Sequence, residues 1–242
     1  MLSKCKGEIE LMVYMGSKRR LAKYLLPILL KDASPGQVYI EPFVGGANMI
    51  CEVPSDYVRI GYDYHKPLIA LLRAVRDGWV PPGKNLTREE YYYVKNNKDK
   101  FSLYYYAFIG FCSFGSKYWG GYPFNKQGAN SFRERSNNLL KQAPKLKGIT
   151  FNFRDYTTLS IPGNSIVYCD PPYQNTCKYK KDIDHTHFWN WCRKIAEHSK
   201  VFISSYDAPE DFKCVYEKEL NDTMRNKKSK IVKVEKLFVK GY

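Results

Sequence analysis

The stretch that decides the fold runs from residue 37 to residue 48 and reads Gln37-Val-Tyr-Ile-Glu41-Pro-Phe-Val-Gly-Gly46-Ala-Asn48. Its first half, Gln37 to Glu41, predicts a short buried strand, because a brief apolar run bounded by turn residues is typical of parallel sheets. Its second half is a turn of small residues, where the backbone can approach a ligand closely. We expect the chain to enter a helix directly after this turn.

The neighbouring segments extend this pattern. Arg19 to Lys31 carries apolar side chains at helical spacing, and Pro35-Gly36 ends that helix. Tyr57 to Tyr62 predicts a second strand that ends at Asp63, and Pro67 to Val75 resumes a helical pattern. Strand, turn, helix and strand in this order form the start of a βαβ unit, so we expect a parallel sheet.

The alternation of strands and helices stops between Asp77 and Gly148, where the chain becomes rich in tyrosine, lysine and polar residues. It returns afterwards, with a helix expected at Thr186–His198 and strands at Ile149–Phe153, Ser165–Cys169, Val201–Ser204, Phe212–Leu220 and Lys230–Val239. We therefore predict an α/β fold with a Rossmann-like, mostly parallel sheet and an antiparallel C-terminal hairpin. Residues 1–76 and 149–242 would form one domain, and residues 77–148 a domain inserted into it.

Composition indicates a folded protein with an anionic partner. The chain has 242 residues, of which 44% are hydrophobic, and its 21 Tyr, 13 Phe and 4 Trp exceed what disordered chains carry. A net charge of +15 suits a polyanion, because each neutralised phosphate releases counterions. A generally basic surface explains the charge equally well, and the tyrosines tilt the choice slightly toward nucleic acid, since their rings stack on bases.

Cysteine and histidine patterns argue against disulfides and metal sites. The seven cysteines include no CxxC pair, so we expect reduced thiols in a cytoplasmic protein. The histidines at positions 65, 185, 187 and 198 do not form a zinc set, and His185 and His187 are expected as polar residues at a helix start. The sequence has no apolar run of about 18 residues and no signal-peptide pattern, so no membrane association is expected.

The strongest chemical motif is Asp170-Pro171-Pro172-Tyr173, which follows an apolar strand. Two prolines force a rigid, extended exit at the carboxyl end of that strand, the edge where open α/β sheets bind ligands. The Asp170 carboxylate and a proline carbonyl would accept the two N–H groups of an amine, and Tyr173 would offer its ring to a planar base. An ordinary proline-terminated strand is the alternative, but Tyr173 and the apolar strand favour an amine site.

The turn after Glu41 points to a nucleoside cofactor. It lacks the spacing of the GxGxxG motif and the Lys-Ser/Thr of a P-loop, which argues against NAD and ATP. Asp63 ends the next predicted strand, where a carboxylate can bind both hydroxyls of a ribose. Asp63 could instead cap a helix, and the surrounding motifs favour the ribose role.

These motifs, in this order, resemble the Dam-type N6-adenine DNA methyltransferases of bacteria and phages, the D12 class. Tyr14-Met15-Gly16-Ser17-Lys18 is similar to that family's Y-x-G-S-K cofactor motif, Glu41 to Gly46 to its E-P-F-x-G loop, and Asp170 to Tyr173 to its D-P-P-Y motif. The likeness covers nearly the whole chain. It implies a Rossmann-like class I methyltransferase sheet with an inserted DNA-recognition domain.

The resemblance also implies S-adenosylmethionine as cofactor, no metal, and catalytic roles for Asp170, Pro171, Pro172 and Tyr173. Phe151-x-x-x-Asp155-Tyr156 takes the place of the family's adenine-binding segment, and Arg225 to Lys228 followed by Glu235 to Val239 resembles its basic C-terminal hairpin. The expected cofactor-binding residues are Tyr14, Gly16, Ser17, Lys18, Glu41, Pro42, Phe43, Gly45, Gly46, Asp63, Tyr64, Asp155, Tyr156 and Asp170.

The insertion is expected to recognise double-stranded DNA, as its counterpart does in this family. The candidate DNA-binding residues are Lys117, Tyr118, Trp119, Tyr122, Asn125, Lys126, Asn130, Arg133 and Arg135, whose types grip phosphates, read base edges or fill the gap left by a flipped base. A solvated surface or a small core under the insertion is the alternative for each. Phe111 to Tyr118 replaces the family's N-G-x-x-R-x-N stretch, so GATC specificity cannot be carried over.

The sequence thus predicts direct methyl transfer to the exocyclic amine of adenine in DNA, in a monomer or weak dimer in the cytoplasm of a bacterium or phage-infected host. No Pro-Cys pair is present for the covalent cytosine-C5 mechanism. Two alternatives remain: the same fold acting on cytosine N4, RNA adenine or protein glutamine, and a DNA-binding protein that has lost catalysis. Restriction, protection of a phage genome and regulation all stay open as roles.

Overall fold

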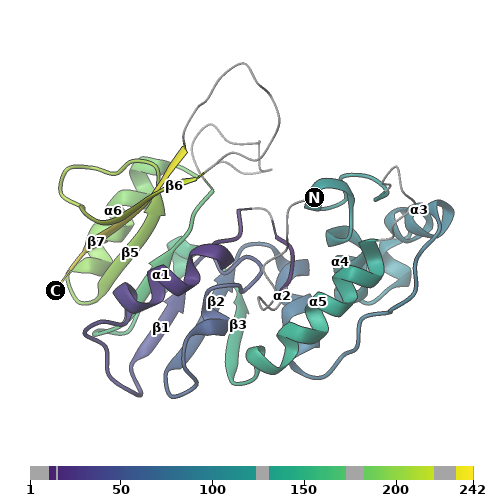
Figure 1. Ribbon diagram of the computed structural model, residues 1–242, viewed down its shortest axis with the longest axis horizontal. Helices are drawn as coiled ribbons and strands as arrows, with labels where there is room; N and C mark the ends of the chain where they lie inside the picture. Colours follow the sequence, from purple (N-terminus) through teal and green to yellow (C-terminus); the bar gives the residue numbers. More distant parts are fainter. Residues whose placement is uncertain (1–10, 15, 124–130, 173–182, 221–232, 242) are drawn as a thin grey trace.

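A seven-stranded sheet forms the centre of the computed structural model, which describes residues 11–14, 16–123, 131–172, 183–220 and 233–241 (Figure 1). The strands are β1 (Val38–Glu41), β2 (Val58–Asp63), β3 (Ile149–Phe153), β4 (Ile166–Cys169), β5 (Lys200–Ser205), β6 (Lys213–Leu220) and β7 (Lys233–Lys240). They lie in the order β3-β2-β1-β4-β5-β7-β6. The first five pair in parallel, and β7 runs antiparallel to both β5 and β6, which confirms the predicted sheet.

Helices follow most of the predicted positions within a few residues. They are α1 (Arg19–Leu29), α2 (Lys66–Arg76), α3 (Arg88–Asn96), α4 (Leu103–Phe111), α5 (Ser131–Leu146) and α6 (His185–Ala196). The start of α3 has a capping box, in which Thr87 Oγ1 accepts from the backbone N–H of Glu90 and the Glu90 carboxylate accepts from that of Thr87. At the start of α6, Asp184 is a simple N-cap whose side chain accepts from the backbone N–H of His187.

Alternation along the strands divides the core between the two faces of the sheet. Tyr39 and Tyr168 pack with α1 and α2 on one face, whereas Ile40 and Val167 pack with α6 on the other. Successive side chains of a strand point to opposite faces, so a central strand buried on both sides reads as a continuous apolar run. The helices therefore cover both faces of the sheet, as in a doubly wound fold (Figure 1).

The prediction of a helix directly after the glycine turn is wrong. The chain forms only one short 3₁₀ turn there, η1 (Ile50–Glu52), and leaves it at Val53 in an extended conformation. Pro54 explains the difference, because a proline disfavours helical geometry in the residue before it and cannot donate a backbone hydrogen bond. The chain then turns into β2.

The segment between α2 and β3 holds α3, α4 and α5 and lies at the β3 end of the sheet, on the right of Figure 1. It shares a hydrophobic core with the sheet, because Phe108 of α4 and Leu139 of α5 are buried in the same cluster as Leu71 of α2. Apolar residues of α4 and α5 thus pack the insertion against the rest of the protein. The division of the chain into two domains stays a prediction.

Several predicted site residues lie outside the described part of the chain: Tyr173, Asn125, Lys126, Asn130 and Arg225 to Lys228. Among the helices within the described ranges, none combines the length and apolar character needed to cross a bilayer.

Candidate active site

The predicted site residues converge where the strand order changes direction. The chain proceeds from β1 to β2 and β3 on one side, whereas β4 pairs with the other side of β1 and leads to β5. Glu41 ends β1 and Asp170 directly follows β4, so both lie at the carboxyl edge beside this switch point. In open α/β sheets the loops on the two sides of a switch point diverge, and ligands bind in the crevice between them.

Lys18 occupies the centre of this edge and is 7% exposed. Its Nζ lies 3.0 Å from Asp170 Oδ1, 3.5 Å from Glu235 Oε1, and 3.2 Å from the carbonyl oxygen of Gly16. Burial lowers the pKa of Lys18, but the carboxylates of Asp170 and Glu235 outweigh it and raise that pKa above its ordinary value. Lys18 is therefore a charged ammonium that links the N-terminal motif to the Asp-Pro-Pro segment.

Glu41 lies behind this group and is 3% exposed. Its Oε1 accepts a hydrogen bond of 3.0 Å from the hydroxyl of Tyr39. Burial raises the pKa of Glu41 well above its ordinary value, the Tyr39 hydrogen bond partly opposes this, and the negative charge of Asp170 raises it further. Glu41 therefore favours its neutral form, whereas Asp170, beside Lys18, is the acid that can present a charged acceptor.

The glycine turn fits closely against Tyr14 of the N-terminal motif. A Cβ atom on Gly46 would lie 2.8 Å from Tyr14 Cβ, and one on Gly45 would lie 3.0 Å from Tyr14 Cε1. Gly45 also has a φ of +48°, in the left-handed region that side chains disfavour. The two glycines are thus required by the packing of Tyr14 onto the turn, in addition to any approach of a ligand.

Two buried amides fasten the N-terminal segment to the turn. Asn48 Nδ2 donates to the carbonyl of Met12 at 3.0 Å and to Ser17 Oγ at 2.8 Å. Gln142 of α5 accepts from the backbone N–H of Met12 at 3.1 Å and donates to the carbonyl of Gly46 at 2.8 Å. Because Gln142 is fully buried, α5 holds the N-terminal segment and the glycine turn in one place.

Asp63 accepts from backbone N–H groups around the turn after β2. Its Oδ2 accepts from Gly45 at 3.0 Å and its Oδ1 from His65 at 2.8 Å. Burial raises the pKa of Asp63, and the hydrogen bonds from His65, Gly45 and Tyr64 partly offset the rise. A carboxylate has about four acceptor positions, so Asp63 retains capacity for a hydroxyl donor. The helix cap considered as the alternative is made by His65, whose Nδ1 accepts from Leu68.

Aromatic side chains flank Asp63 at the same edge. Tyr64 and Phe153 are 56% and 44% exposed, and their ring centroids lie 6.1 Å apart. Tyr156 packs against Phe43 with ring centroids 5.2 Å apart, and burial raises the pKa of Tyr156 to about 12. Asp155 accepts from the backbone and hydroxyl of Thr157 and starts the short turn that carries Tyr156. Exposed ring faces beside a carboxylate suit a nucleoside.

The predicted DNA-contacting aromatics lie in a small core of the insertion. Tyr118 and Trp119 pack so closely on α4 that a Cβ on Gly110 would lie 2.5 Å and 2.7 Å from their ring atoms. Tyr122 packs against Tyr91 and donates from its hydroxyl to the carbonyl of Leu86 at 2.7 Å. This is the arrangement of the small-core alternative, and a role of these rings toward DNA stays a prediction.

The described basic candidates divide into two groups. Lys117 and Arg133 are exposed and available to a phosphate backbone. Arg135 is half-buried and lines a small cavity with Met12, Phe111 and Leu139, between the N-terminal segment and the insertion. This position differs from that of a surface residue that binds the phosphate backbone, and a role of Arg135 in DNA binding stays a prediction.

Three residues of the site escaped the sequence interpretation as functional candidates: Asn48, Gln142 and Glu235. The first two are buried polar residues whose partners lie far away in the chain, so no local pattern reveals them. Glu235 does leave a signal, because the period of two along β7 places it on the same buried face as Leu237. A lone acid at an inward-facing strand position predicts a buried charged partner.

Fold and geometry together define a class of protein before any comparison. A parallel sheet has its switch point beside a glycine turn, and the next strand ends in Asp63 with exposed aromatic rings beside it. An acceptor carboxylate with exposed ring faces beside it would fit a nucleoside, with Asp63 accepting from the ribose hydroxyls. In addition, Asp170 already accepts an N–H donor from Lys18, as an amine-binding carboxylate must. The class is that of Rossmann-like α/β proteins with a candidate ligand-binding edge at the switch point of the sheet.

Comparison with known families makes this class specific. The sequence profile of the D12 class N6 adenine-specific DNA methyltransferases matches residues 14–237. The chain therefore belongs to this family. The matched span begins at the first residue of the Tyr14 to Lys18 motif and ends in β7, so it includes that motif, the Glu41 to Gly46 turn and Asp170 to Tyr173.

Among solved structures, the chain is similar to SMU.472, a protein assigned as a methyltransferase and solved in complex with SAH. The two share 12% sequence identity with a TM-score of 0.39, over 93% of this chain. This chain spans about half of the other, 52% of its length. No curated protein sequence matches the chain.

Proposed function

We propose that this protein transfers a methyl group from S-adenosylmethionine to the N6 amine of adenine in double-stranded DNA. The observation that carries the proposal is the meeting of Lys18, Asp170 and the glycine turn at the switch point, in a chain that belongs to an adenine-specific family. The residues of the N-terminal motif, the turn from Glu41 to Gly46, Asp63 and Tyr64 would hold the cofactor. When bound, it supplies an electrophilic methyl carbon.

Asp170 and the prolines after it would hold the target amine. An amine conjugated to a purine is a weak nucleophile, and acceptors for its two N–H groups help it to pyramidalise and turn its lone pair outward. Asp170 is suited to this task as a charged acceptor beside Lys18, with its side chain 22% exposed. The new N–C bond would form as the S–C bond of the methyl donor breaks, with S-adenosylhomocysteine as the leaving group. The surplus proton would leave to solvent, so Asp170 serves to orient the amine and need not be a strong base.

DNA would bind across the carboxyl edge, with the insertion on one side. A base inside a duplex cannot reach Asp170, so the target adenine must flip out at a cost of a few kcal/mol. The exposed Lys117 and Arg133 would contribute phosphate contacts, which position the duplex without reading its sequence. The aromatic core around Tyr118, Trp119 and Tyr122 would support the loops that meet the DNA.

Labelled methyl transfer tests the proposal. Wild-type protein, Asp170→Asn and the control Asp56→Asn are incubated with labelled S-adenosylmethionine and duplex DNA of mixed sequence, and the methylated bases are mapped. Asp56 is exposed and precedes β2 at the opposite edge of the sheet. We expect N6-methyladenine from wild type and control, and a rate about 10²- to 10³-fold lower for Asp170→Asn, the usual loss when a preorganised polar contact to the reacting centre is removed.

Each other outcome identifies a different function. N4-methylcytosine in place of N6-methyladenine would reassign the acceptor within the same fold, and transfer to RNA alone would reassign the polymer. Retention of full activity by Asp170→Asn would remove the proposed amine site. Binding of both DNA and cofactor without any transfer by the wild type would indicate a protein that binds DNA and has lost catalysis.

A further inference from the structure

Lys18 presents a difficulty for the proposed reaction. Its ammonium group donates to Asp170, the carboxylate that must also accept the amine of the target base. The side chain of Asp170 is 22% exposed, whereas those of Lys18 and Glu235 are 6% and 4% exposed. A substrate therefore meets Asp170 first, with Lys18 and Glu235 behind it. Asp170 must share or release its bond to Lys18 when the amine arrives.

A buried ammonium group cannot lose its partner without a large penalty, because nothing then replaces the water it gave up. Glu235 Oε1 lies 3.5 Å from Lys18 Nζ, half an ångström farther than Asp170 Oδ1. A movement of a few tenths of an ångström would turn this contact into a full charge-assisted hydrogen bond. Lys18 can thus transfer its main interaction from one carboxylate to the other and remain paired throughout.

The position of Glu235 suits such a role. It lies on β7, where it pairs with Lys218 of β6, and from the next residue onward β7 is held on both sides, because Lys236 pairs with Ser205 of β5 and with Glu217 of β6. The hydroxyls of Tyr168 and Ser204 lie 2.8 Å apart and tie β4, which leads to Asp170, to β5 next to β7. A side chain on a strand paired at both edges holds its position better than one on a loop.

We propose that Glu235 is a positioning residue that retains Lys18 while Asp170 turns its carboxylate to the target amine. This inference rests on the proposed function. Among the residues that the structure describes, the charged groups that face Lys18 are Asp170 after β4 and Glu235 on β7, with Glu41 of β1 adjacent to Asp170. Without Glu235, Lys18 stays bound to Asp170, and the target amine competes with it for the same oxygen atoms.

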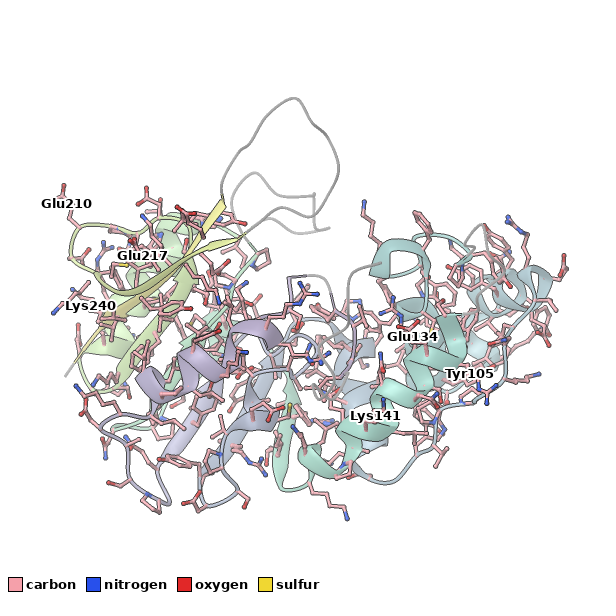
Figure 2. The ribbon with its side chains drawn as sticks, in the orientation of Figure 1. Tyr105, Glu134, Lys141, Glu210, Glu217 and Lys240 are labelled. Atoms are coloured by element: carbon pink, nitrogen blue, oxygen red, sulfur yellow. The ribbon has the colours of Figure 1, made fainter. Side chains whose placement is uncertain are left out.

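The test compares steady-state methylation of duplex DNA by wild type, Glu235→Gln and Glu217→Gln. Glu217 is the matched control, because it is exposed on β6 of the same hairpin, opposite the neighbour of Glu235 (Figure 2). We expect Glu235→Gln to lower kcat roughly 10- to 100-fold, the effect of losing one hydrogen bond to a charged group. The KM values should change little, and Glu217→Gln should match wild type. A wild-type kcat in Glu235→Gln would overturn the inference.

A double-mutant cycle with Lys18→Met shows whether Glu235 acts through Lys18. The double variant should be no slower than Lys18→Met alone, whereas the product of the two single losses would mean independent roles and overturn the inference. If Glu235→Gln folds poorly, Glu235→Asp replaces it. That variant keeps the charge, and we expect it to recover most of kcat, whereas a loss as large as that of Glu235→Gln would contradict the proposal.

A readout that does not need turnover separates this inference from the proposed function. NMR titration of protein labelled with ¹⁵N at lysine Nζ, with Lys18→Arg to assign the signal, reports the pKa of Lys18. We expect Glu235→Gln to lower that pKa, since one of the two carboxylates that raise it is gone. An unchanged titration would overturn the role of Glu235 even in an active enzyme. Failure of the wild type to methylate adenine would instead overturn the proposed function.

Discussion

The carboxyl edge of the sheet and the insertion are assembled by different forces. At the edge, Lys18, Asp170 and Glu235 come from three distant parts of the chain and meet through ion pairs and hydrogen bonds. In the insertion, Tyr91, Trp119 and their neighbours come from one stretch of about fifty residues and pack through their rings. The difference teaches that the site depends on the order of the strands, whereas the ring contacts of the insertion join residues of one segment, which then shares its core with the sheet.

Helix α5 joins the two regions. Gln142 bonds both the N-terminal segment and the glycine turn, while Phe132 and Leu139 on the same helix belong to the aromatic and apolar core. If the insertion binds DNA as proposed, α5 would connect the DNA contacts to the N-terminal segment and the glycine turn. Substitutions at the carboxyl edge, in the insertion and in α5 should show how far the stability and binding of one region depend on the other.

The largest effect is expected from Gln142→Leu. Leucine keeps most of the volume but leaves the N–H of Met12 and the carbonyl of Gly46 buried without their partner. Each such loss costs about 1–3 kcal/mol, so we expect the free energy of unfolding to fall by about 2–5 kcal/mol, measured by urea denaturation. The affinity for S-adenosylmethionine, measured by calorimetry, should fall as well, because both cofactor motifs lose an anchor.

The matched control for this variant is Asn137→Leu, an exposed amide on the same helix. It should unfold within about 0.5 kcal/mol of wild type, as surface substitutions usually do. If the free energy of unfolding fell equally in the two variants, the cause would be leucine in α5 and not the lost hydrogen bonds of Gln142. A destabilised Gln142→Leu with unaltered cofactor affinity would break the proposed link between the helix and the cofactor motifs.

A smaller, local effect is expected from Gly46→Ala at the carboxyl edge. The new Cβ would lie 2.8 Å from Tyr14 Cβ and 3.0 Å from Asn48 Nδ2, so the turn and the N-terminal motif must move apart. Overpacking of this kind costs about 1–3 kcal/mol. We expect calorimetry to show weaker cofactor binding by roughly tenfold, the equivalent of about 1.4 kcal/mol. Gly163→Ala, whose Cβ would lie 3.8 Å from the His198 carbonyl, should bind normally.

The smallest net effect is expected from Gly110→Ala inside the insertion. Its Cβ would lie 2.5 Å from Tyr118 Cε2, a clash worth about 1–3 kcal/mol, but alanine also favours helix α4 by about 0.5–1 kcal/mol. We expect the clash to exceed the helical gain, with a lower unfolding midpoint and weaker DNA binding in a fluorescence anisotropy assay. Tyr118 reaches the glycine turn only through Phe111 and Tyr14, with ring centroids 4.7 Å and 5.8 Å apart, so we expect cofactor affinity to fall less than in Gly46→Ala.

The control here is Gly83→Ala, also within the insertion, where a Cβ would meet nothing within 4 Å. It should be neutral or slightly stabilising, because alanine restricts the unfolded chain more than glycine does. If Gly110→Ala weakened cofactor binding as strongly as Gly46→Ala, the two regions would not be as separate as their contacts indicate.

The sequence predicted those parts of the site that follow a strand end. Glu41, Asp63 and Asp170 were placed correctly at one edge, because parallel strands all end on the same side of a sheet. The prediction of a helix after the glycine turn was wrong, because it did not take into account that Pro54 disfavours helical geometry in the residue before it. Gln142 could not be predicted, because its partners Met12 and Gly46 lie far away in the chain and contribute only backbone atoms.

The sequence by itself determined the order of the strands, the helices α1, α2 and α6, the family, and the chemical types present at the edge of the sheet. These depend on short-range patterns: apolar alternation, turn residues, and motifs of a few residues each. Only the tertiary structure decided that Lys18 is shared between Asp170 and Glu235 and that α5 fastens the cofactor motifs. The physical reason is that burial makes a charged or polar group depend on specific distant partners, and the sequence does not record which ones the fold brings within reach.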